Sequence, residues 1–127
     1  MPWTMSSERP IYLQLVDRIK RQIVAGTYGP GERFPAVREL ALEAAVNPNT
    51  MQRALAALEA EGLLITSRTA GRTVTSEEAV IKDMKEKIAE EEYERFYQSM
   101  KELGYDDEGI REFIKNAKTP DVKGGQS

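Results

Sequence analysis

The fold is decided by residues 45–63, which read AVNPNTMQRALAALEAEGL. Asn47 is a favourable helix N-cap, because its side-chain oxygen accepts an otherwise unpaired backbone N–H of the first turn. Pro48 suits the first helical position, where its missing N–H costs nothing. Gly62 is a typical residue at a helix end. We therefore expect a helix that begins at Pro48 and ends near Glu61.

This helix has two different sides. At about 100° per residue, one side carries the apolar residues Met51, Ala54, Leu55 and Leu58, and the opposite side carries Asn49, Gln52, Arg53 and Ala56. A solvated face usually prefers Glu and Lys, which the first three turns lack. Amide side chains can pair with adenine and Arg with guanine or phosphate, while Thr50 can donate to a phosphate. The pattern favours a DNA recognition helix, with a solvated face as the alternative.

Two further helices precede this one. Pro10 can open a helix that Gly26 closes, with Tyr12, Leu15, Ile19 and Ile23 spaced for one buried face. A Gly- and Pro-rich loop, GTYGPGERFP at 26–35, separates it from a short helix over 36–45. Because almost no linker remains before Asn47, the second and third helices should cross steeply, as in a helix-turn-helix.

After Gly62 the spacing of the apolar residues is no longer that of a helix. Residues 63–75, LLITSRTAGRTVT, are rich in residues that favour strands and predict a β-hairpin. Arg68 and Arg72 flank its tip, where Thr69, Ala70 and Gly71 form the turn. A hairpin that follows a helix-turn-helix can act as a DNA-binding wing, and narrow grooves attract Arg. Arg38, at the start of the second helix, is a third basic residue near the same surface. The alternatives are a solubilising edge hairpin and an ion pair of Arg38 with Glu39 or Glu43.

From Pro10 to Thr75 the sequence resembles the GntR family of bacterial winged-helix transcription regulators. The resemblance is carried by PIYLQLVDRIKRQIVAG at 10–26, PGERFPAVRELA at 30–41, VNPNTMQRAL at 46–55 and LEAEGLL at 58–64. It implies a winged helix-turn-helix that binds operator DNA as a homodimer. The DNA contacts that it implies are Arg38, Asn49, Thr50, Gln52 and Arg53, with Gly71 as the wing glycine. The wing departs from the family's usual Arg-Gly-x-Gly-Thr-Phe-Val, since this chain reads RTAGRTV at 68–74.

The back half predicts two more helices, a long one that Ser76 caps and that runs to Leu103, and a last one from Asp106 to about Ala117. About 50 residues are too few to enclose a sizeable ligand pocket, and this short tail resembles that of the YtrA-type subfamily, in which two helices serve dimerisation. The apolar residues that we assign to dimerisation are Met84, Ile88, Tyr93, Phe96, Met100, Leu103, Ile110, Phe113 and Ile114. Alternatively, these helices fold back onto the winged domain as ordinary core.

We therefore expect a mainly α fold with a small β-hairpin, a winged helix-turn-helix followed by two C-terminal helices. The domains predicted are a flexible N-terminal arm (1–9), the DNA-binding domain (10–75), a helical dimerisation region (76–118) and a disordered tail (119–127). Residues 1–75 hold nine Lys/Arg and seven Asp/Glu, a balance of +2, whereas residues 76–127 hold nine and fourteen, a balance of −5. The front half suits a polyanion and the back half faces away from it.

Composition excludes several classes of function. Among its 127 residues the chain has no Cys and no His, which removes thiol chemistry and the commonest general base and metal ligand. We expect no enzyme, metal or cofactor, no membrane span and a cytoplasmic location. The expected partners are double-stranded operator DNA and a second copy of the chain, and a small-molecule effector stays open. A winged-helix module that binds proteins without DNA is the rival interpretation.

Overall fold

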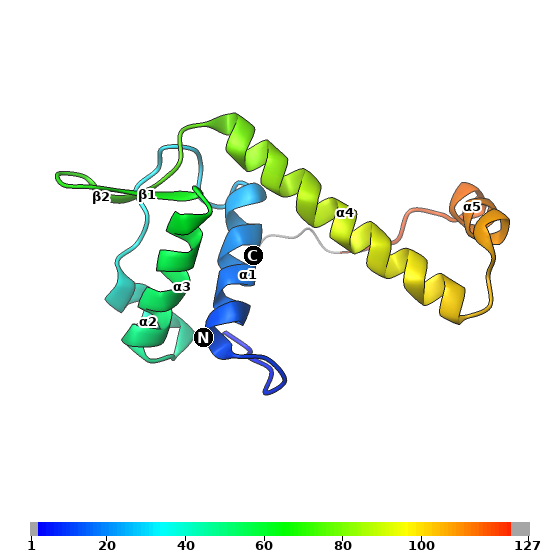
Figure 1. Ribbon diagram of the computed structural model, residues 1–127, viewed down its shortest axis with the longest axis horizontal. Coiled ribbons are helices and arrows are strands. Elements are labelled where there is room, and N and C mark those ends of the chain that lie inside the picture. The colour runs from blue at the N-terminus through cyan, green and yellow to red at the C-terminus, as the bar shows by residue number, and fades with distance from the viewer. Residues whose placement is uncertain (1–2, 123–127) are drawn as a thin grey trace. The chain divides into compact units, whose positions relative to one another are not determined.

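The computed structural model describes residues 3–122 and confirms the predicted fold class. Its elements follow the expected order (Figure 1): α1 (Ile11–Val24), α2 (Val37–Ala44), α3 (Pro48–Ala60), β1 (Leu64–Ser67), β2 (Gly71–Val74), α4 (Glu78–Glu102) and α5 (Asp107–Asn116). The chain divides into two compact units, Met1–Lys85 and Glu86–Ser127. In the part of the chain that the structure describes, no helix is long and apolar enough to cross a membrane.

The core of the first unit lies among α1, α2, α3 and the base of the hairpin. The apolar stripes that the spacing predicts are buried in it, including Leu15, Ile19 and Ile23 of α1 and the four apolar residues of α3. An ion pair between Lys20 Nζ and Glu61 Oε1, at 3.0 Å, ties α1 to the end of α3. Helix α3 is therefore held against α1 and α2.

The turn between α2 and α3 is as tight as the sequence predicts. Ala45 takes the left-handed conformation, with φ 61°, and the backbone N–H of Val46 returns to the carbonyl of Ala41 at 3.0 Å. The Asn47 side chain accepts the backbone N–H of Asn49 at 2.7 Å, and Pro48 takes the first helical position. These local contacts end one helix and start the next within three residues, which sets the geometry of a helix-turn-helix.

The hairpin differs from expectation at its tip. Ser67 pairs with Gly71 in the antiparallel register, so the turn consists of residues 68–70 and Gly71 begins the second strand. The loop before α2 pairs with β2 at one isolated bridge: Arg33 bridges to Thr73, and the N–H of Phe34 donates to the carbonyl of Arg72 at 2.8 Å. The loop before α2 is thereby joined to the hairpin, which extends beyond the helices (Figure 1).

The described part of the arm predicted over residues 1–9 packs against the first unit through Trp3. Trp3 is only 7% exposed and belongs to the core, where its ring lies 4.6 Å from the Arg18 guanidinium carbon. The amide of Gln14 accepts from the backbone N–H of Ser6 and donates to its carbonyl, both at 2.7 Å. An indole buries enough apolar surface to offset the ordering of a short segment.

The long helix begins at Glu78, one residue later than a cap at Ser76 predicts. The hydroxyl of Thr75, not Ser76, turns the chain by accepting the N–H of Glu77 at 3.1 Å. The first turns of α4 then pack against the winged core through Val80, Ile81 and Met84. The core of the first unit thus extends beyond the hairpin into α4.

In the second unit, α5 begins where the sequence predicts. The Asp106 carboxylate accepts the N–H of Gly109 at 2.8 Å. Asp107 receives a hydrogen bond from the hydroxyl of Tyr97 and an ion pair from Lys101 Nζ at 2.8 Å. Residues 119–122 of the predicted disordered tail form no regular element, and 123–127 lie outside the described residues.

Candidate nucleic-acid interface

Helix α3 presents the two sides that its sequence predicts. Met51, Ala54, Leu55 and Leu58 are fully buried. On the opposite side Asn49, Gln52, Arg53 and Ala56 are exposed, and Thr50 is half-buried. Among the described residues, no hydrogen bond or ion pair engages the Gln52 side chain. An amide that is exposed, unpaired and carried on a rigid helix can use both its donor and its acceptor on a ligand.

Arg53 is exposed but not free to move at random. Its guanidinium carbon lies 3.7 Å from the centroid of the Tyr12 ring, a close cation–π contact. Tyr12 belongs to the first turn of α1, so the start of α1 and the start of α3 form one surface. A shallow groove follows this junction, lined by Pro10, Ile11, Tyr12, Asn49, Thr50 and Arg53.

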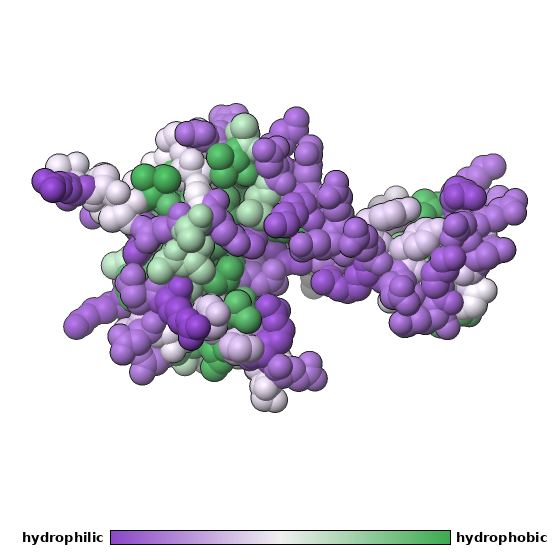
Figure 2. Space-filling view, in the orientation of Figure 1, coloured by the Kyte–Doolittle hydropathy of each residue, from purple (hydrophilic) through white to green (hydrophobic). Residues whose placement is uncertain are grey.

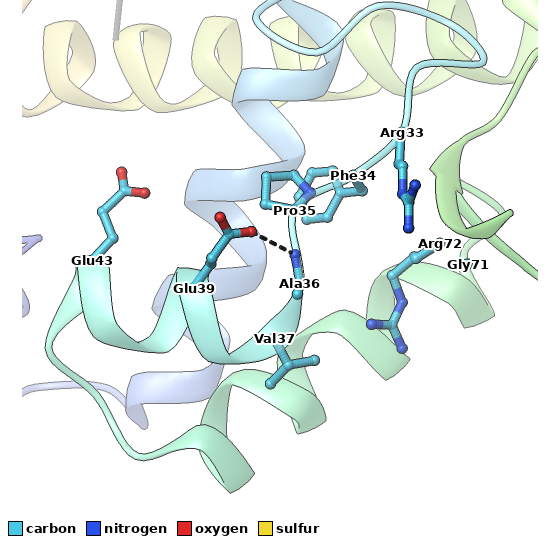
Figure 3. Close-up of a pocket in the computed structure, with 9 residues that line it drawn as sticks. All are labelled: Arg33, Phe34, Pro35, Ala36, Val37, Glu39, Glu43, Gly71 and Arg72. Atoms are coloured by element: carbon cyan, nitrogen blue, oxygen red, sulfur yellow. Dashed lines mark hydrogen bonds between the residues drawn. The ribbon is translucent and has the colours of Figure 1, made fainter.

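Arg38 is exposed in the first turn of α2. The ion pair with Glu39 or Glu43, which was the alternative, is absent from the described part of the chain. Glu39 instead accepts the backbone N–H of Ala36 at 3.3 Å, so it closes the start of its own helix (Figure 3). Arg38 is therefore available to an anion beside α3.

The three wing residues differ in their surroundings. Arg68 is exposed in the turn, and Gly71 has φ 74°, a conformation that residues with a Cβ rarely adopt. Arg72 is turned towards α3, where its Nε lies 3.5 Å from Glu59 Oε2 and its side chain is only 16% exposed. The geometry makes Arg72 an anchor between the wing and α3 and leaves Arg68 at the tip.

Arg33 is a basic residue that the sequence analysis missed. It is exposed and points from the loop before α2 towards Gly71 and Arg72 (Figure 3). Its Nη2 lies 4.0 Å from the place that a Cβ would take at Gly71. Together these residues line a groove between the loop, α2 and the wing. The sequence places Arg33 in a loop, because it comes directly before Phe34 and Pro35. The pairing of this loop with β2 is a long-range contact that no local pattern signals.

The residues predicted for dimerisation fall into three groups. Met84 packs against the core of the first unit, and Met100 and Ile110 are buried. The others are exposed or half-buried: Ile88, Tyr93, Phe96, Leu103, Phe113 and Ile114. Leu103 is 75% exposed and Tyr93 56%.

The last helix keeps an apolar face open within the described residues. The rings of Tyr105 and Phe113 meet edge to face, with centroids 6.0 Å apart. They border a shallow groove along α5 that Gly109 and Ala117 also line. Pale and green side chains appear there among hydrophilic ones, whereas the visible face of α4 is almost entirely hydrophilic (Figure 2). Large exposed apolar side chains of the second unit thus lie near α5, at Tyr105, Phe113 and Ile114, and also at Tyr93 and Leu103.

Known proteins match this chain in sequence. Residues 11–74 match the model of the gntR family of bacterial regulatory proteins. The chain is 35% identical over 122 residues to the HTH-type transcriptional repressor YtrA of Bacillus subtilis (strain 168), covering 94% of this chain and 92% of that one.

Two solved structures extend the comparison. A GntR family transcriptional regulator from Listeria monocytogenes superposes with a TM-score of 0.80 at 37% identity, over 90% of this chain and all of its own, 100%. The DNA-binding domain AraR(DBD), solved in complex with operator ORR3, has a TM-score of 0.51 at 27% identity, over 59% of this chain and 90% of its own.

Proposed function

Because this chain belongs to the gntR family of bacterial regulatory proteins and is a transcriptional regulator with that family's winged helix, we propose that it is a repressor that binds a palindromic operator as a homodimer. The observation that carries the proposal is the exposed polar side of α3, on a helix whose other side is fully buried. Neither catalysis nor a cofactor is part of the proposed activity. The proposed site of action is the cytoplasm.

On this proposal α3 enters the major groove with its N-terminal turns. Gln52 and Asn49 reach base edges, because an amide can donate and accept towards adenine at once. Thr50 and Arg53 contact phosphates, and Ala56 lets the helix lie close to the groove. Arg38 binds the sugar-phosphate backbone beside α3.

The wing holds an adjacent part of the backbone. Gly71 offers main chain without a side chain, and Arg33 and Arg68 supply positive charge on either side of it. Arg72 supports this arrangement from within, since its ion pair with Glu59 fixes the hairpin to α3. A pre-arranged wing loses less conformational entropy when DNA binds.

The second unit supplies the homodimer contact. Its exposed side chains on α4 and α5 are those that a symmetric copy would cover, since a two-fold interface uses the same patch on both chains. The repressor named YtrA, which matches 94% of this chain, supports the assignment to repression, and the operator complex of AraR(DBD) supports the assignment to operator DNA.

The alternative function is a protein-interaction module on the same fold. An interface for a protein would favour aromatic or other large apolar side chains at its centre. Among the described residues, the exposed side of α3 carries amides, Arg and Ala instead. The chemistry of this surface thus favours nucleic acid.

The test distinguishes contacts to base edges from contacts to the sugar-phosphate backbone. Gln52→Ala should relax the preference at one or two operator positions, by roughly 1–3 kcal/mol each. Arg38→Ala should weaken binding to most sequences. It should also reduce the steepness with which log affinity falls with log salt concentration by about one. Both variants should unfold at the wild-type temperature, because both side chains are exposed. Binding of each variant to an operator library at two salt concentrations is the measurement. If Gln52→Ala lowers every affinity equally, base reading by Gln52 is wrong.

A further inference from the structure

We propose that Tyr12 is a positioning residue for DNA recognition: its ring holds the Arg53 guanidinium on the α1 side of α3, where Arg53 grips a phosphate instead of reading a base. This inference rests on the proposed function. It extends the DNA-binding surface beyond the helix-turn-helix and the wing to the first turn of α1.

The contact is close and its support is rigid. The guanidinium carbon lies 3.7 Å from the ring centroid, well within the roughly 6 Å over which a cation–π attraction acts. Tyr12 is half-buried and packs against the core of the first unit. Its ring is therefore fixed by packing, and Arg53 is the side chain that adapts to it.

The stacked contact leaves the useful edge of Arg53 available. A guanidinium that lies over a ring uses its face, whereas its N–H donors point outward in its plane. In the described part of the chain, no carboxylate or carbonyl accepts a hydrogen bond from Arg53. The side chain is thus pre-oriented, so less of its rotamer entropy, about 2 kcal/mol for a free Arg, is lost when it binds an anion.

The side to which Tyr12 draws Arg53 decides what Arg53 can contact. Residues 52 and 53 differ by about 100° around the helix, and α1 lies on one flank of α3. Stacking on α1 therefore moves the charge from the outermost line of the helix towards that flank. Thr50 borders the same groove and offers a hydroxyl donor. A guanidinium and a hydroxyl at the flank of a recognition helix suit a phosphate.

A double-mutant cycle on the full chain tests this assignment. The probe is a duplex of about 30 base pairs, long enough for two half-sites a helical turn apart, enriched from a randomised pool by the wild-type protein. Tyr12→Leu should weaken its binding about threefold, as expected for one cation–π contact, and Tyr12→Phe should bind as wild type because it keeps the ring. In an Arg53→Gln background, Tyr12→Leu should have no further effect.

Two further readouts distinguish positioning from a general loss of structure. Arg53→Gln should lower the salt slope by about one and keep the base preference. Tyr28→Leu is the matched control, since Tyr28 also packs on the core but its ring contacts Phe34 at a tilt, with centroids 4.8 Å apart. Its effect on binding should be the same with and without Arg53.

The outcomes separate this inference from the proposed function. If the wild-type protein enriches no duplex, the proposed function fails and the inference fails with it. If the wild type binds but Tyr12→Leu and Arg53→Gln are additive, or Tyr12→Phe is as weak as Tyr12→Leu, only the role of Tyr12 is wrong. A change of base preference in Arg53→Gln would equally overturn the assignment to phosphate.

Discussion

At the scale of single residues, two asparagines two positions apart divide support from recognition. Asn47 has its side-chain oxygen committed to the start of α3, at 2.7 Å from the N–H of Asn49. The Asn49 side chain itself is exposed and makes no hydrogen bond among the described residues. The same side-chain chemistry therefore has a structural duty at one position and is available to a ligand at the next.

This division predicts opposite outcomes for one substitution. Asn47→Ala should lower the free energy of unfolding by about 1 kcal/mol, the usual cost of a lost N-cap, while Asn47→Asp should retain most of it. Asn49→Ala should leave unfolding unchanged but weaken operator binding. Urea unfolding and duplex binding of the three variants check this. A stability loss in Asn49→Ala as large as that in Asn47→Ala would contradict it.

At the scale of elements, local signals explain what the sequence could predict. The starts of α3 and α5 were predictable because Asn47, Pro48 and Asp106 act on backbone groups within a few residues of themselves. Arg33 could not be placed because its pairing with β2 joins segments that are 40 residues apart. Trp3 could not be placed either, since Arg18, on which its ring packs, lies 15 residues away on α1. The contact of Arg72 with Glu59 could not be predicted, because Glu59 lies on another element.

The start of α5 should respond to acid through Asp107. The hydrogen bonds from Lys101 and then Tyr97 lower the pKa of the Asp107 carboxyl below its ordinary value. A lowered folded-state pKa contributes stability above the unfolded pKa of about 3.9, which is lost as pH falls through the folded value. Helix content should therefore fall as the pH drops below about 4, partly because α5 detaches.

Substitution separates Asp107 from the other carboxylates. Asp107→Asn should already have a less stable α5 at neutral pH and a smaller acid-induced loss of helix. Glu108→Gln is the matched control, since Glu108 lies in the same first turn but has no ion pair among the described residues. Circular dichroism from pH 7 to about pH 2 is the measurement. Equal acid profiles for both variants would show that the Lys101 and Tyr97 contacts do not act through Asp107.

At the scale of the whole molecule, the division of α4 gives the two units different roles. Its first turns complete the winged core through Val80, Ile81 and Met84, so a chain cut after Ser76 would lose part of that core. A chain cut after Lys85 keeps it. We expect residues 1–85 to fold as a monomer, because the exposed apolar side chains of α4 and α5 lie beyond the cut.

Loss of the second unit should therefore weaken DNA binding without removing it. Two linked half-site contacts become separate binding events, and the gain from a high effective concentration, about 100-fold or more, is lost. Sedimentation and duplex titration of residues 1–85 beside the full chain check this prediction. If residues 1–85 sediment as a dimer, α4 and α5 do not carry dimerisation.

Selection from a randomised duplex pool with the full-length chain, followed by sequencing, tests the central claim most directly. A homodimer that inserts two α3 helices should enrich an inverted repeat whose half-site centres lie about 10 base pairs or a multiple apart. The enriched sequence should be the same at two salt concentrations, while affinity falls as salt rises. No enrichment, or a single half-site without symmetry, would contradict paired recognition of DNA by this protein.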